Sequence, residues 1–210
     1  PGNDVTNSIA IDSEKNIILV GHVEGILEYS NCHEKLLNAS SFDGIIIKIK
    51  KNGICDWIRQ IGSKGNSEKL DDKINDVAVD SENNIYVTGY TTGNLAKENT
   101  NNKDVFVTKY DKNGKRIWLD QFGSEVDDSG KSININIENE VIVGGSTNGI
   151  LGDKNYGKND LFIVKYDVLG FKKKISQYGT PDDDELKDFD INSSGDILIV
   201  GETYGKFENF

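Results

Sequence analysis

The chain has no methionine and only two each of proline, cysteine, histidine and arginine among its 210 residues. With two histidines, no Ser-His-Asp arrangement is recognisable, and no G-x-S-x-G motif occurs. Since 22 of the 24 basic residues are lysines, bidentate guanidinium recognition of anions is disfavoured. No apolar run approaches the roughly 18 residues that a membrane-spanning helix needs. We therefore expect no membrane insertion and no enzyme of the serine-hydrolase type.

Acidic residues outnumber basic ones, and the net charge is −11. Nucleic-acid binding requires clustered Lys and Arg, so a nucleic-acid partner is not expected for this acidic protein. The chain begins at Pro1 and contains no methionine, from which we expect a processed or excised part of a longer protein. A signal peptide would already be gone from such a part.

What the sequence does contain is a fourfold repeat. A glycine that closes a β-like segment recurs at intervals of 68, 56 and 56 residues, at Gly21, Gly89, Gly145 and Gly201. An aspartate keeps the same step, at Asp4, Asp72, Asp128 and Asp184. A repeat of this length built from short strand patterns predicts a radial or stacked all-β array.

One repeat reads as four strands. Residues 75–80 and 85–90 flank a polar turn, and residues 104–110 and 116–122 flank Asn113-Gly114, a hairpin signal because both residues tolerate positive φ. Several strands are apolar on both faces, as in Ile45-Ile46-Ile47, which predicts sheets covered on both sides. No stretch shows a convincing helical period.

The segments "DVAVDSENNIYVTGYTTGNL" and "KDVFVTKYDKNGKRIWLDQFG" resemble the bacterial β-propeller repeat often called the SBBP repeat. The resemblance covers essentially the whole chain, and the first copy diverges most. It implies an all-β fold, a β-propeller of four-stranded antiparallel blades. It also implies a secreted or surface-attached bacterial protein, since members of the family are typically found there.

Counting strands predicts about three and a half blades in a single propeller domain or a part of one. The repeats fall at approximately 1–68, 69–124, 125–180 and 181–210, and the last is incomplete. We interpret the chain as an arc of a larger propeller. The alternative is a small four-bladed ring whose last blade is incomplete. A true arc leaves a strand edge exposed, which favours self-association.

The repeated aspartates Asp72, Asp128 and Asp184 are candidate calcium ligands, because several carboxylates at one rim suit a hard cation. The competing interpretation is structural: each repeat needs one carboxylate to accept backbone N–H bonds between blades. No stretch matches the D-x-[DN]-x-[DN]-G calcium loop. Recurrence in every copy favours the structural interpretation, so no cofactor is expected, and calcium is the alternative.

The cysteines and histidines all lie in the first copy: His22, Cys32, His33 and Cys55. Their scattered spacing does not favour a zinc site. A Cys32–Cys55 disulfide would suit an extracellular protein, but the loop that holds Cys32 and the strand that begins at Cys55 are predicted at opposite rims. We therefore expect unpaired cysteines.

Trp57 and Trp118 occupy equivalent positions, and the third copy has Lys174 there. A sugar-binding platform is one interpretation, and packing against the next blade is the favoured one. The loops after the second strand are better binding candidates, because variable loops on a rigid frame often carry recognition. The residues expected to bind are Asn94, Lys97, Asn99, Asn101, Lys154, Asn155 and Tyr156.

The sequence thus predicts a non-catalytic binding or scaffold module, extracellular or at the cell surface, which recognises protein or glycan through its loop rims. One alternative is a structural subunit that self-assembles through open blade edges. A second alternative is a polysaccharide hydrolase or lyase that uses the carboxylates of Asp182 to Glu185. Carboxylates that recur in every copy are poor catalytic candidates, because an active site normally occurs once.

Overall fold

The computed structural model describes residues 2–25, 32, 41–63, 70–99 and 102–206. These residues form fourteen strands, arranged as three four-stranded antiparallel sheets and one two-stranded sheet. Within this part of the chain, no helix is long and apolar enough to cross a membrane.

Each sheet is a simple meander, and we call the sheets blades 1 to 4. Blade 1 contains β1 (Val5–Ile11), β2 (Ile17–Glu24), β3 (Phe42–Ile49) and β4 (Cys55–Ile61). Blade 2 contains β5 (Asp72–Val79), β6 (Ile85–Thr91), β7 (Asp104–Tyr110) and β8 (Arg116–Phe122). Blade 3 contains β9 (Asp128–Ile135), β10 (Val141–Thr147), β11 (Asp160–Tyr166) and β12 (Lys172–Tyr178). Blade 4 consists of β13 (Asp184–Ile191) and β14 (Ile197–Thr203).

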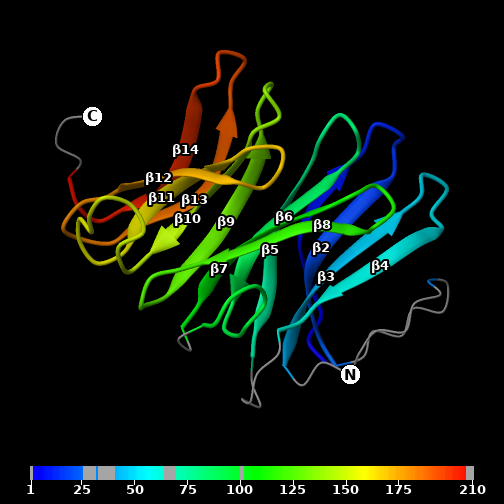
Figure 1. Ribbon diagram of the computed structural model, residues 1–210, viewed down its shortest axis with the longest axis horizontal. Coiled ribbons are helices and arrows are strands. Elements are labelled where there is room, and N and C mark those ends of the chain that lie inside the picture. The colour runs from blue at the N-terminus through cyan, green and yellow to red at the C-terminus, as the bar shows by residue number, and fades with distance from the viewer. Residues whose placement is uncertain (1, 26–31, 33–40, 64–69, 100–101, 207–210) are drawn as a thin grey trace.

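The blades stand side by side in an open arc, with blade 1 at one end and blade 4 at the other (Figure 1). The first strands β1, β5, β9 and β13 are neighbours along the inside of the arc. The arc of three and a half blades predicted from the sequence is thus the arrangement that the structure has. Among the described strands, those of blade 1 and blade 4 lie at opposite ends of the arc and do not meet as a ring would require.

Most of the hydrophobic core lies between the blades, and one small cluster lies on the outer face of blade 1. One buried cluster joins blades 1 and 2 through residues such as Ile46, Trp57, Ile74 and Phe106. A second cluster joins blades 2 and 3, and a smaller one joins blade 3 to blade 4. Both faces of the second and third strands are therefore buried in blades 2 and 3, which confirms the prediction made from their two-sided apolar pattern.

The turns between the third and fourth strands use one left-handed residue each. Gly53, Gly114 and Gly170 have φ values of +84°, +77° and +87°. The hairpin predicted at Asn113-Gly114 is present, and of these two residues only Gly114 has positive φ. Asp111 explains the difference: its carboxylate accepts the N–H groups of Asn113 and Lys115, which closes a longer turn whose last residue alone is left-handed.

The inner strands are tied together by a row of hydroxyl and carboxylate groups. Ser8 donates to Asp76 Oδ1 at 2.7 Å, across the first junction. Ser132 lies 3.1 Å from Asp76 Oδ2 on one side and 2.7 Å from Asp188 Oδ1 on the other. Equivalent positions of four consecutive blades thus alternate between serine and aspartate.

Candidate functional site

The repeated aspartates are the first residues of β5, β9 and β13, where each carboxylate clamps the loop that arrives from the previous blade. Asp72 Oδ2 accepts the N–H of Ser63 at 2.6 Å. Asp128 Oδ2 accepts both the N–H and the hydroxyl of Ser124, and Asp184 does the same for Thr180. These three carboxylates are at most 1% exposed, whereas Asp4 is exposed.

Burial makes the charged form of these carboxyl groups costly. It raises the pKa of Asp72 from 3.8 to about 6, and the nearby Asp43 carboxylate adds to the shift. Burial also raises the pKa of Asp128, with Asp104 as the neighbouring charge. The hydrogen bonds from the clamped loops act in the opposite direction, because they stabilise the ionised form.

A calcium ion would need six to eight oxygen ligands, roughly, around one point. Each repeated aspartate instead belongs to a different blade, and its Oδ2 atom already accepts a backbone N–H of the preceding loop. The described residues contain no group of three His, Cys, Asp or Glu that could hold a metal ion. The hydrogen bonds of the three aspartates therefore fit a loop clamp, and calcium binding by their second carboxylate oxygens stays a prediction.

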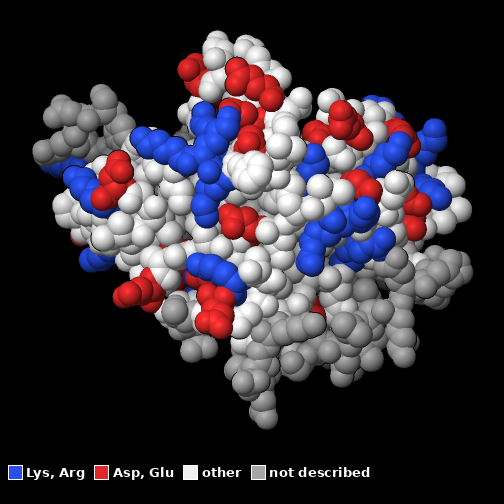
Figure 2. Space-filling model, in the orientation of Figure 1, with Lys and Arg blue, Asp and Glu red and all other residues white. Residues whose placement is uncertain are grey.

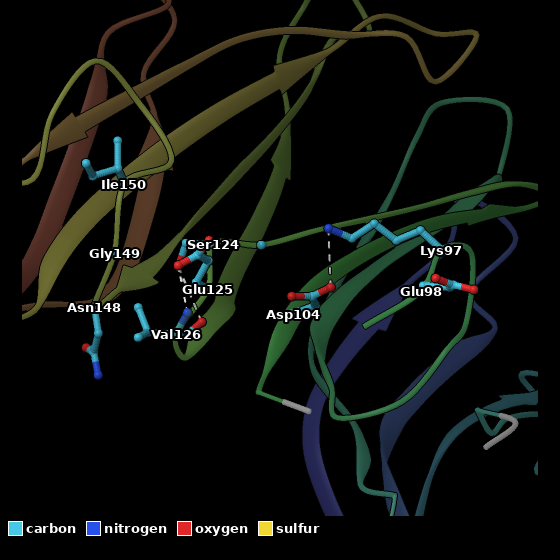
Figure 3. Close-up of a pocket in the computed structure, with 10 residues that line it drawn as sticks. Lys97, Glu98, Asp104, Ser124, Glu125, Val126, Asn148, Gly149 and Ile150 are labelled. Carbon is cyan, nitrogen blue, oxygen red and sulfur yellow. Dashed lines mark hydrogen bonds and ion pairs between the residues drawn. The ribbon is translucent and has the colours of Figure 1, made fainter. Parts of the chain in front are cut away.

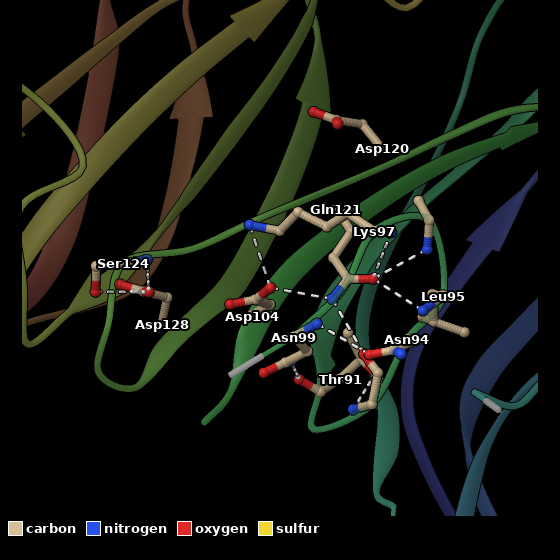
Figure 4. A network of polar contacts seen from close by, with 12 residues as sticks. Thr91, Asn94, Leu95, Lys97, Asn99, Asp104, Asp120, Gln121, Ser124 and Asp128 are labelled. Atoms are coloured by element: carbon tan, nitrogen blue, oxygen red, sulfur yellow. Dashed lines mark hydrogen bonds and ion pairs between the residues drawn. The ribbon is translucent and has the colours of Figure 1, made fainter. Parts of the chain in front are cut away.

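A second set of residues, which the sequence analysis did not single out, completes each clamp. Gln121 of β8 donates to Asp104 at the start of β7 at 3.0 Å, and its side-chain oxygen accepts the N–H groups of Leu95 and Ala96 (Figure 4). Gln177 makes the same bonds to Asp160, Leu151 and Gly152, and Gln60 donates to Asp43. The signal was present: a glutamine recurs two residues before Gly62, Gly123 and Gly179.

These polar contacts hold the floor of a cleft of about 630 Å³ at the rim between blades 2 and 3 (Figure 3). Loops that follow β6, β8 and β10 supply its walls. Lys97 extends over it with its ammonium group 3.4 Å from the buried carboxylate of Asp104. The remaining lining residues are Glu98, Gly123, Ser124, Glu125, Val126, Asn148, Gly149 and Ile150.

The predicted binding residues fall into two groups. Lys97 lines the cleft, and Asn155 lies beside it by donating to Asn148 O at 3.3 Å. Asn94 and Asn99 stiffen the loop itself, since Asn94 Oδ1 accepts the Asn99 N–H at 2.9 Å and Asn99 donates to Thr91 O.

Of the other predicted binding residues, two lie at the junction between blades 3 and 4, and one lies outside the described residues. The Lys154 ammonium lies 4.2 Å from the centre of the Tyr156 ring. At that junction the Gly157 backbone approaches Thr180 so closely that a Cβ atom would lie 2.0 Å from its carbonyl oxygen. Asn101 lies outside the described residues.

The cysteines form a disulfide, with their Cα atoms 5.5 Å apart, so the prediction of unpaired cysteines was wrong. The topological argument assumed that the loop after β2 stays at its own rim. Gly25 and Cys32 are seven residues apart, which allows about 24 Å of extended chain and is enough to run the length of a seven-residue strand. Cys32 is buried against Val23, Ile45 and Ile58, on the face of blade 1 that points away from blade 2. His33 lies outside the described residues.

The tryptophans pack against the next blade, as the favoured interpretation predicted. The Trp57 ring lies against Gly114 and donates from Nε1 to Lys112 O at 3.2 Å. Trp118 lies against Gly170 and stacks on Tyr166, with ring centres 5.8 Å apart. Neither indole is presented to solvent as a sugar platform would be.

The acidic run at the start of blade 4 does not converge on one point. Asp182 and Asp183 are about half exposed, and both are paired with Lys158 at 3.5 and 3.7 Å. Asp184 is buried in its clamp, and Glu185 is paired with Lys131 and Lys187. Two of the four carboxylates thus share Lys158, the other two have other partners, and the four are not arranged as a facing acid and base pair.

Comparison with known proteins gives a match to one family model. Residues 56–96 match the model described as Beta-propeller repeat (SBBP). No curated protein matches the chain significantly. The matched segment begins in β4 and runs through β5 and β6, so it spans the junction between blades 1 and 2 and includes Trp57, Asp72 and Gly89. Residues 56–96 therefore match an SBBP β-propeller repeat, and the all-β arrangement of three four-stranded sheets and one two-stranded sheet is consistent with the blades of a propeller.

Proposed function

We propose that this propeller segment is a non-catalytic binding or scaffold module, which recognises a protein partner at the cleft between blades 2 and 3. The observation that supports this most directly is the cleft itself. The long side chains of Lys97 and Glu98 flank it, and the hydrogen bond between Gln121 and Asp104 holds its floor in place. A rigid floor with polar groups around it lowers the entropic cost of binding.

The chemistry of the lining favours a polypeptide over a glycan. Val126 and Ile150 are 40% and 61% exposed and offer apolar contacts beside groups of both charges. None of the ten lining residues is aromatic, so the ring on which a sugar face would stack is missing there. A peptide with one acidic and one apolar side chain matches Lys97 and Ile150.

The module is proposed to act outside the cell or at the cell surface. The Cys32–Cys55 disulfide supports this location, since disulfides persist in oxidising compartments and are rare in the cytosol.

A peptide array and a glycan array, each probed with labelled protein, test the proposal. We expect peptide ligands whose binding is weakened about tenfold or more by Ile150→Asp, because a buried apolar contact is replaced by a charge. Ile54→Asp is the matched control, since Ile54 is 55% exposed in the turn before β4, away from the cleft. Glycan ligands, or peptide binding that ignores Ile150→Asp, would contradict the proposed site.

A further inference from the structure

The turn between β11 and β12 carries apolar side chains where the corresponding turn of blade 2 is polar. Val168, Leu169 and Phe171 of blade 3 are 46%, 70% and 68% exposed. The residues at the same positions in the turn between β7 and β8 are Lys112, Asn113 and Lys115. Those three residues are exposed as well, although blade 2 has a complete blade on each side. Exposure is therefore a property of this position in a blade, and only the apolar character is particular to blade 3.

The fold of the turn does not require apolar side chains. Asp167 Oδ1 accepts the N–H groups of Leu169 and Phe171 at 2.9 and 3.0 Å. Asp111 Oδ1 holds the turn of blade 2 in the same way, with polar residues at the two donor positions. Since polar residues form the same turn, the apolar side chains of blade 3 are available for a contact outside the chain.

A second turn extends this apolar surface. The register of β9, β10 and β11 places the turn of residues 136–140 beside the turn of residues 167–171. Ile137 in the first of these turns is 84% exposed, and its counterpart in blade 2 is Ser81. Figure 2 shows uncharged surface at the place where the turn after β11 lies in Figure 1, with lysines and acidic groups beside it. Exposed apolar patches rimmed by polar groups mark interaction sites. We call this patch the blade 3 tip, and its residues are Ile137, Val168, Leu169 and Phe171.

The charges around the tip do not favour a lipid surface. The two turns carry three carboxylates, and the start of β12 adds three lysines, so the net charge of this surface is zero. The protein as a whole has a net charge of −11, whereas attraction to anionic lipid requires clustered cations. The carboxylates are those of Glu138, Glu140 and Asp167, and the lysines are Lys172, Lys173 and Lys174. A protein surface is therefore the better match.

The cleft between blades 2 and 3 is such a surface, and the match rests on the function proposed above. That cleft is expected to take a peptide with one acidic and one apolar side chain, which Lys97 and Ile150 would contact. At the tip, Asp167 directly precedes Val168 and Leu169. The Oδ2 atom of Asp167 accepts no hydrogen bond from the described residues, so it remains available to a lysine. The tip thus presents both kinds of side chain that the cleft favours.

The cleft and the tip of one chain cannot meet each other. The loop that holds Ile150 precedes β11 and the turn of the tip follows it, so they lie at opposite ends of a seven-residue strand. A strand of that length separates them by roughly 20 Å. A tip can therefore reach only the cleft of another molecule.

We propose that the blade 3 tip of one copy inserts into the cleft between blades 2 and 3 of a second copy. Leu169 then packs against Ile150, and Asp167 pairs with Lys97. Each copy in such a head-to-tail contact keeps one free cleft or one free tip, so the contact generates chains or rings of copies and not a two-fold dimer.

Light scattering on a sizing column, over a range of protein concentrations, tests the proposal. Near-physiological ionic strength is used, because it screens the repulsion between acidic copies beyond about 8 Å. We expect wild-type protein to form assemblies that grow with concentration. A tip variant combines Val168→Lys, Leu169→Asn and Phe171→Lys, which gives blade 3 the turn residues with which blade 2 already folds. This variant and the cleft variant Ile150→Asp should each associate about tenfold more weakly or less.

Mixing the two variants gives the sharpest result. The tip variant keeps an intact cleft, and Ile150→Asp keeps an intact tip, so an equimolar mixture should form complexes of two chains and no longer ones. The matched control is Asn113→Asp at the counterpart of Leu169 in blade 2, which should assemble as the wild type does.

Four results would overturn the proposal. A wild-type protein that stays monomeric at every concentration would overturn this inference but not the proposed function, which the peptide array tests separately. Assembly that persists in both variants would assign the contact to another surface. A mixture of the variants without two-chain complexes would show that tip and cleft are not partners. Binding to phosphatidylcholine vesicles that the tip variant loses, without self-association of the wild type, would assign the tip to a lipid surface.

Discussion

Replacing Asp72 by asparagine should remove part of the pH dependence of stability. Burial raises the pKa of Asp72 to about 6 in the folded protein, against 3.8 for an ordinary aspartate. The folded state therefore holds this proton more tightly than the unfolded chain does. The resulting stabilisation is complete below pH 4 and is lost as the pH rises through 6, because folding then requires a buried carboxylate.

The magnitude follows from the difference between the two pKa values. At about 1.4 kcal/mol for each pKa unit, ionised Asp72 costs the folded state about 3 kcal/mol at pH 7 relative to its protonated form. Roughly 1 kcal/mol of this is regained on lowering the pH from 7 to 5. Asparagine keeps an oxygen for the Ser63 N–H and has no charge to bury. The Asp72→Asn variant should therefore gain about 1 kcal/mol relative to wild type between pH 5 and pH 7.

Urea denaturation of both proteins at several pH values measures this difference, with Asp153→Asn as the control at an exposed aspartate. Asp128, whose pKa burial also raises, is present in both proteins and cancels in the comparison. A stability difference between wild type and Asp72→Asn that stays constant from pH 5 to pH 7 would refute the reasoning.

Three further perturbations test the clamp, the junctions and the disulfide. The melting temperatures measured in calcium and in chelator should agree, because the carboxylate of each repeated aspartate accepts N–H groups of its loop. Stabilisation by calcium that the Asp128→Asn variant loses would contradict this prediction. Trp118→Ala should cost about 3 kcal/mol through lost contacts with Tyr166 and Gly170, whereas Lys174→Ala at the same strand position should change stability by less than about 0.5 kcal/mol. Cys32→Ser should lower the free energy of unfolding by about 3 kcal/mol, as expected for a cross-link spanning 23 residues; an unchanged denaturation midpoint in oxidised and reduced wild type would contradict this.

Much of the architecture could be predicted because the pattern of each strand recurs in several repeats of the sequence. The strands expected at 104–110 and 116–122 are β7 and β8 with the same bounds. The position of Trp57 against the next blade followed from its recurrence as Trp118. Periodicity of this kind averages out the ambiguity of any single short strand.

The errors arose where a feature occurs once or depends on side-chain geometry. The enlarged loop of blade 1 has no second copy, so no repeat pattern indicated that Cys32 reaches Cys55, and the disulfide was considered but rejected. The hairpin at Asn113-Gly114 was predicted, but which of the two residues is left-handed depends on the Asp111 carboxylate, which a dipeptide rule does not include. The cleft between blades 2 and 3 joins loops from three strands, and Lys97 was found from loop composition whereas Glu125 and Ile150 were not. Contacts between segments far apart in the sequence produce no local sequence pattern, so they could not be predicted.

Ser132 has one hydroxyl proton and two carboxylate neighbours, one on each adjoining blade. The proton can be donated to Asp76 or to Asp188 but not to both at once. The two junctions of blade 3 are therefore in competition for the same hydrogen bond. In a double-mutant cycle, substitutions at Asp76 and Asp188 should be non-additive although these residues belong to blades that are not neighbours, and the coupling should vanish in Ser132→Ala.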